Sequence, residues 1–260
     1  MTITALAGAN YWSLAAFWPL ECQTLYGPDA MKVALYVLPY LFAITFGVVL
    51  VNWGLSLFRG KNRELLTFSS MIMTVAIACL SVVNQYNPSV GIGLDFLAGL
   101  GTGGIIRILN LCDRLLTIEP AVTVLTTVCP DELIATITAA TVSARLVGNA
   151  IGFAVYFNVL QNKVTPILPV NVGTAVAQAG LPPDQIPTFV GAFLGQTGSL
   201  AGYAPAVLLA ATNALKETYV EGFRIVYFVS IGFGVSATIA CLFLGDIKKY
   251  MVDRVAVDIH

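Results

Sequence analysis

Long apolar segments, separated by short polar ones, run along most of the chain. A transmembrane helix needs about 20 apolar residues, because each residue advances about 1.5 Å across a hydrocarbon core about 30 Å thick. The pattern predicts six spans, over residues 4–20, 33–58, 65–83, 90–129, 133–160 and 223–244. We therefore expect an all-α, polytopic membrane protein whose six helices form one bundle, a single transmembrane domain over residues 1–260.

The fourth predicted span is interrupted by residues 107–119. These residues read RILNLCDRLLTIE, with two Arg, one Asp and one Glu, and the ten residues after them, 120–129, are too few to cross a bilayer. Without the interruption, the flanking apolar segments would join into one span. We interpret 107–119 as an insertion into a transmembrane helix, such as a misassigned intron would supply. The alternative is a cytoplasmic loop with an amphipathic segment.

The polar segments predict an orientation in the membrane. An RGKNRE segment follows the second span, and a polar tail covers residues 245–260. If that segment and the tail are cytoplasmic, eight Lys and Arg side chains face the cytoplasm and four face the outside, as the positive-inside rule requires. The connection 161–221, rich in Ala, Gly and Pro, would then form a long outer loop that contains short helices.

The fifth predicted span carries one full charge, Arg145, near its middle. A charge at that depth costs at least about 2.5–3.5 kcal/mol on insertion scales, so it needs a partner, a protein interior or water. Helical spacing gathers polar and small residues on the face of Arg145 and apolar residues on the opposite face. The residues that we expect to line a cavity and contact substrate are Thr138, Thr141, Arg145, Asn149 and Tyr156. The alternative is an Arg in a salt bridge inside the bundle, with no part in transport.

The fourth span is rich in glycine. Gly99 and Gly103 are four residues apart and would lie on one side of a helix, a spacing that permits close contact with a second helix. A nucleotide-binding loop is the rival interpretation, but no strand precedes these glycines and no Gly-Lys-Ser/Thr follows them. Asp95 lies inside the same span, either as a proton-binding carboxylate or as an ordinary acid near the membrane surface.

The composition argues against several classes of protein. Hydrophobic residues make up 57% of the chain and charged residues 10%, whereas soluble domains carry about 25% charged residues. A net charge of −1 gives no reason to expect a nucleic-acid partner. The one histidine is His260, and the five cysteines stand singly. We therefore expect no metal site, no disulfide framework, no cofactor and no enzyme active site.

Several motifs resemble those of a known family. Six spans with a basic turn between the second and third look like the C-terminal half of a major facilitator superfamily transporter. Within it, the chain resembles the branch of fungal trichothecene efflux pumps, close to siderophore-iron transporters. The residues that carry this resemblance are Trp18-Pro19, Leu25-Tyr26-Gly27, VCPDELIAT at 128–136, Arg145, Gly148, Ile151-Gly152, Tyr156, Asn158, Asn162-Lys163, LGD at 244–246 and MVDRVAV at 251–257.

The resemblance implies a secondary transporter that exports a small organic molecule, such as a toxin, drug or siderophore, through a fungal membrane, in particular the plasma membrane. Its partners would be the lipid bilayer, the substrate and protons. Asp95 would bind and release protons, and Arg145 would position an anionic group or pair with Asp95. Because the first span begins almost at residue 1, we expect a missing N-terminal half. The alternative is a truncated membrane protein that is inactive in transport without a partner half.

Overall fold

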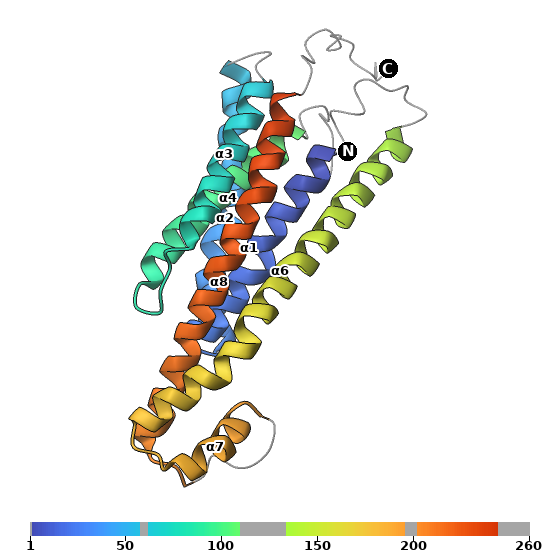
Figure 1. Ribbon diagram of the computed structural model, residues 1–260. Coiled ribbons are helices and arrows are strands. Elements are labelled where there is room, and N and C mark those ends of the chain that lie inside the picture. Colours follow the sequence, from blue (N-terminus) through green and yellow to red (C-terminus); the bar gives the residue numbers. More distant parts are fainter. Residues whose placement is uncertain (1, 58–61, 110–133, 196–201, 244–260) are drawn as a thin grey trace, which may run out of the picture.

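The computed structural model describes residues 2–57, 62–109, 134–195 and 202–243 (Figure 1). Among these residues every regular element is a helix. The helices are α1 (Thr2–Tyr26), α2 (Ala30–Leu57), α3 (Asn62–Leu80), α4 (Pro88–Leu109), α6 (Ile134–Gln178), the short 3₁₀ helix η2 (Pro183–Gln185), α7 (Ile186–Phe193) and α8 (Pro205–Leu242). The prediction of an all-α bundle is confirmed.

The six long helices pack in two groups of three. In one group α4 lies against α2 and α3, and in the other α1 lies against α6 and α8. Contacts of α3 with α8 and of α1 with α2 join the groups. Most of the large buried side chains, such as Trp18, Tyr156 and Tyr227, belong to one continuous core between these helices.

Four helices among the described residues are long and apolar enough to cross a membrane by length and composition: α2, α3, α6 and α8. The other two long helices are α1, with 25 residues, and α4, with 22. At about 1.5 Å per residue, the length of each also exceeds the thickness of the hydrocarbon core. α1 also carries polar side chains where it packs against other helices. Asn10, Ser13 and Glu21, for example, are buried residues of α1. A helix inside a bundle does not have to present apolar side chains to lipid on every face.

The glycines of α4 set its contacts with both neighbours. A methyl group on Gly99 would lie 2.7 Å from the Cβ of Ala43 on α2, and Gly103 faces the backbone of the same helix at Ile44. On the other side, Gly101 lies against Met73 and Gly104 against Ser69, both on α3. The predicted role of Gly99 and Gly103 in close helix contact is confirmed.

The fourth helix differs from its prediction at one end. α4 continues without a break through Arg107 to Leu109, and its length alone is sufficient to cross the hydrocarbon core. The span therefore does not require residues 120–129. The rest of the interruption, residues 110–119, lies outside the described residues, so the insertion remains a hypothesis.

The connection 161–221 is mostly helical, so its prediction as a loop is wrong, while its place on the outer side stays a prediction. α6 continues past residue 160 to Gln178, and α8 already begins at Pro205. A second apolar cluster, centred on Val172, Phe189 and Ala211, holds these extensions and α7 together. We call this part, residues 161–195 and 202–221, the α6–α8 hairpin. With 45 residues, α6 is about 68 Å long at about 1.5 Å per residue, so it extends far beyond one bilayer.

Candidate functional site

Two carboxyl groups lie enclosed in the half of the bundle that is nearer to the α6–α8 hairpin. The first is Asp95 on α4, which is 0% exposed, and neither of its carboxyl oxygens has a hydrogen-bond partner among the described residues. One turn earlier, Gly91 leaves room for the indole ring of Trp18 on α1. Burying an ionised carboxylate without a partner costs several kcal/mol, so this position is unusual for an acid with only a structural role.

The second carboxyl group is Glu21 on α1, which is 1% exposed. The hydroxyl group of Tyr227 on α8, itself fully buried, donates a hydrogen bond to Oε2 of Glu21 at 2.5 Å. This contact joins helices that lie more than 200 residues apart in the sequence. Both Glu21 and Asp95 lie close enough to Cys22 and Tyr227 to act on them electrostatically. The two acids therefore share one buried region between α1, α4 and α8.

The sequence reasoning missed Glu21 because it ended the first span at residue 20, before the polar stretch ECQT. α1 instead passes through Pro19 and ends at Tyr26. Asp95 is thus joined by a second acid that is buried inside a long helix. A signal was present: Glu21 follows Leu14 and Phe17 by seven and four residues, which places it on their buried face.

The face of α6 that was predicted to line a cavity lies largely against α1. Methyl groups on Gly148 and Gly152 would approach the Cα atoms of Ala5 and Ala9 to 2.7 and 2.8 Å. In the orientation of its amide that satisfies hydrogen bonding, the side chain of Asn149 donates to the carbonyl oxygen of Gly8 at 2.8 Å. The same small residues that make this face polar also allow a second helix to approach it.

Tyr156 lies in the core and is 0% exposed. Its ring meets Phe17 and Phe233 edge-on, with centroids 6.0 and 5.6 Å apart. Its hydroxyl group has no hydrogen-bond partner among the described residues. Asn149 and Tyr156 therefore occupy helix contacts in this structure, which differs from the open cavity face that their spacing predicted.

Arg145 is half-buried on the same helix, with its side chain beside Gly8 of α1. Asp95 lies near Trp18, ten residues further along α1, which corresponds to about 15 Å at about 1.5 Å per residue. The resemblance implied two roles for Arg145, which were to position an anionic group or to pair with Asp95. This separation argues against the direct ion pair. The side chains of Thr138 and Thr141 lie outside the described residues.

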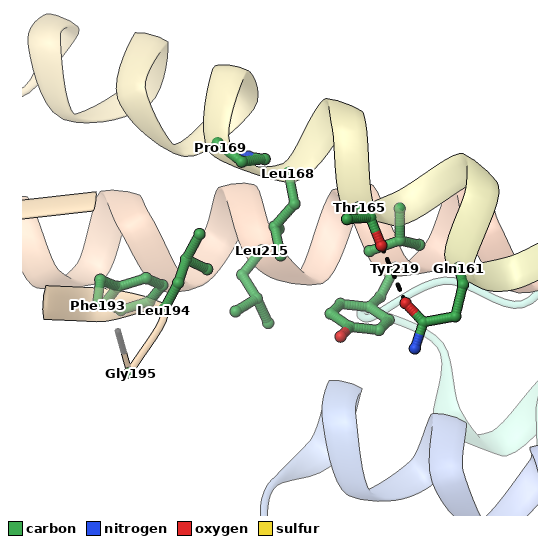
Figure 2. A pocket seen from close by; sticks show the side chains of 10 residues that line it. Gln161, Thr165, Leu168, Pro169, Phe193, Leu194, Gly195, Leu215 and Tyr219 are labelled. Carbon is green, nitrogen blue, oxygen red and sulfur yellow. Dashed lines mark hydrogen bonds between the residues drawn. The ribbon is translucent and has the colours of Figure 1, made fainter. Parts of the chain in front are cut away.

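A cavity of about 510 Å³ lies at the base of the α6–α8 hairpin (Figure 2). Gln161 and Thr165 of α6 form its polar side together with Tyr219 of α8, and the hydroxyl group of Thr165 donates to Oε1 of Gln161 at 2.9 Å. Leu168 and Leu215 belong to its apolar side. No charged side chain lines the cavity among the described residues.

Comparisons with known proteins agree with the fold. The sequence model of the fungal trichothecene efflux pump family matches residues 1–260. The MFS-type transporter prx5 of Penicillium rubens is 25% identical over 257 residues, which are 97% of this chain and 45% of the relative. The trichothecene efflux pump TRI12 of Fusarium sporotrichioides is 21% identical over 98% of this chain and 42% of its own length. The chain thus spans less than half the length of these two relatives. It belongs to the fungal trichothecene efflux pump family of multi-pass membrane transporters.

Proposed function

We propose that the chain forms one half of a proton-coupled exporter of a small organic molecule, such as a toxin, drug or siderophore, in the fungal plasma membrane. The observation that carries this proposal is the enclosed and unpaired carboxyl group of Asp95 in a chain of an efflux family. An acid that alternates between a dry and a wet environment exchanges a proton with each change.

Arg145, Thr138 and Thr141 are the proposed substrate-contacting residues. Helical spacing predicts one shared face for them near the end of α6 opposite to the hairpin, where Arg145 is partly accessible. Its charge suits an anionic or strongly polar substrate group. Asn149 and Tyr156 would support this site indirectly, because their contacts fix α6 against α1 and α8.

The alternative is a membrane protein that is inactive in transport unless a second half completes it. This alternative is supported by the length of the chain, which covers 45% and 42% of the lengths of the two relatives. Alternating access requires two bundles that move around a site between them. We therefore expect little transport by this chain alone and substantial transport when a second half is present.

Dye efflux from yeast cells tests both versions. The cells would express this chain alone, or together with the part of the Penicillium relative that this chain does not match. We expect efflux from the paired cells, loss of efflux with a proton uncoupler, and at least a tenfold loss with Asp95→Asn. Asp184→Asn, an exposed acid of η2, is the matched control and should leave efflux unchanged.

Two outcomes would change the proposal. Efflux by the chain alone at the rate of the pair would remove the need for a second half. Correct insertion of both parts with no efflux of any tested compound would favour the inactive alternative.

A further inference from the structure

The contact between Glu21 and Tyr227 connects α1 with α8, two helices that are far apart in the sequence. Among the described residues α1 is the first long helix and α8 is the last, and they meet through a hydrogen bond between two buried side chains. The bond lies on the side of the core where α1 ends and the α6–α8 hairpin begins, with Leu160, Val164 and Phe223 in the same core. Opening of the bundle at this end would have to separate or rehydrate this pair.

The groups around this pair supply no positive charge. The titratable side chains on which Glu21 or Asp95 acts are Cys22 and Tyr26 of α1, Tyr40 of α2 and Tyr227 of α8. All of them are neutral in their ordinary state, and no Lys or Arg occurs among them in the described part of the chain. Within the described part of the chain, a negative charge on Glu21 would therefore be stabilised by the Tyr227 hydroxyl group alone.

We propose that Glu21 is a second proton-binding group and that its hydrogen bond with Tyr227 couples proton binding to the contact between α1 and α8. In the enclosed arrangement Glu21 carries its proton and Tyr227 donates to its other oxygen. When this end of the bundle opens, water reaches the carboxyl group, its O–H bond breaks, and the proton passes to a water molecule. The carboxylate then favours the hydrated arrangement, which keeps α1 and α8 apart.

This inference rests on the proposed export function but names a residue that the function did not include. Asp95 and Glu21 would form a pair of acids in which only the second is tied to another helix by a side chain.

Infrared difference spectroscopy on the whole chain in lipid nanodiscs tests the inference without any substrate or transport. The carbonyl stretch of a protonated carboxyl group appears outside the amide bands and disappears as the group ionises. Over a pH titration we expect two such bands, one lost in Glu21→Gln and the other in Asp95→Asn. Tyr227→Phe should keep the Glu21 band but shift its frequency and its titration midpoint, because the hydrogen bond is gone. Glu217→Gln, an exposed acid of α8, should change neither band.

Glu21→Asp provides a second variant if Tyr227→Phe does not fold, as judged by circular dichroism. It keeps the carboxyl group but shortens its reach by one methylene, so the band should remain and shift. A spectrum in which Glu21→Gln removes no titrating band would overturn the inference, whatever the transport assay gives. Titration of the Glu21 band in a chain that exports nothing with any second half would instead leave the inference standing and remove the proposed export.

Discussion

Single glycines set how closely the helices of this bundle approach one another. Gly148 and Gly152 bring α6 onto the backbone of α1, and Gly99 and Gly103 do the same for α4 and α2. Other glycines do not lie in close helix contacts. Gly232 on α8 would meet nothing within 4 Å if it carried a methyl group. The pair Gly148 and Gly232 therefore allows the packing role to be separated from the helix propensity of glycine.

Gly148→Ala should destabilise the chain, because the new methyl group meets the backbone of Ala5, which cannot rotate away. Overpacking of this kind costs about 1–3 kcal/mol. Gly232→Ala should be neutral or should stabilise by up to about 1 kcal/mol, since alanine favours a helix more than glycine does. Thermal unfolding in detergent, followed by circular dichroism at the helix band, checks both. Equal midpoints for the two variants would contradict the close contact of α1 and α6.

At the scale of the element, α6 with 45 residues and α8 with 38 are each longer than one bilayer crossing requires. The extensions hold their own apolar cluster, in which Phe189 of α7 is fully buried and meets Tyr203 edge-on, with centroids 4.8 Å apart. Pro166 and Pro169 lie inside α6 without ending it, since contacts with neighbouring elements can offset the lost hydrogen bonds. The hairpin is therefore expected to loosen without unfolding of the bundle.

Phe189→Ala should release α7 from the hairpin, because removal of a buried phenylalanine side chain costs about 3–5 kcal/mol. Limited proteolysis should then cut within residues 181–195 much faster than in the unsubstituted chain, while α1 to α4 remain protected. The control is Leu209→Ala, a change at a side chain that is 64% exposed on α8, which should leave the cleavage rate unchanged. Cleavage of the bundle helices at the same accelerated rate would show that the hairpin and the bundle unfold as one unit.

At the scale of the whole molecule, the contacts repeat with a regular pattern. If the chain is divided into α1, α2, α3 and α4, α6, α8, the first helix of each set packs against the second and third helices of the other set. In three of these contacts, α1 with α6, α4 with α2 and α4 with α3, glycines let one helix approach the backbone of the other. Such an exchange between three-helix sets is what the resemblance to transporters with inverted repeats predicts.

The predicted orientation places the α6–α8 hairpin outside and the start of α3 in the cytoplasm, at opposite ends of the bundle (Figure 1). A cysteine introduced as Asp184→Cys should therefore react with a membrane-impermeant maleimide in intact cells. One introduced as Glu64→Cys should react only after permeabilisation, and the unsubstituted chain gives the background of its own thiols. Labelling in the reverse pattern would invert the orientation, and labelling of both sites in intact cells would argue against a spanning bundle.

Much of this architecture follows from the sequence by itself. The apolar segments determine that the chain is a helical membrane protein, because a hydrocarbon core accepts long apolar helices and little else. The spacing of Gly99 and Gly103 indicated a close helix contact before its partner was known. The resemblance around residues 128–136 and Arg145 named the family that the comparisons show.

The tertiary structure alone decided which faces the helices share. The polar side chains of Asn149 and Tyr156 predicted a face that lines a cavity. A polar face with glycines is equally suited to packing against another helix, and sequence spacing does not distinguish these two arrangements. The length of α6 and α8 depends on contacts between segments far apart in the chain, which local composition does not contain. Glu21 is the clearest case. Its polar neighbours in the sequence predict the end of a span, whereas in the folded chain α8 places Tyr227 next to it, so that Glu21 is a buried acid with a hydrogen-bond partner.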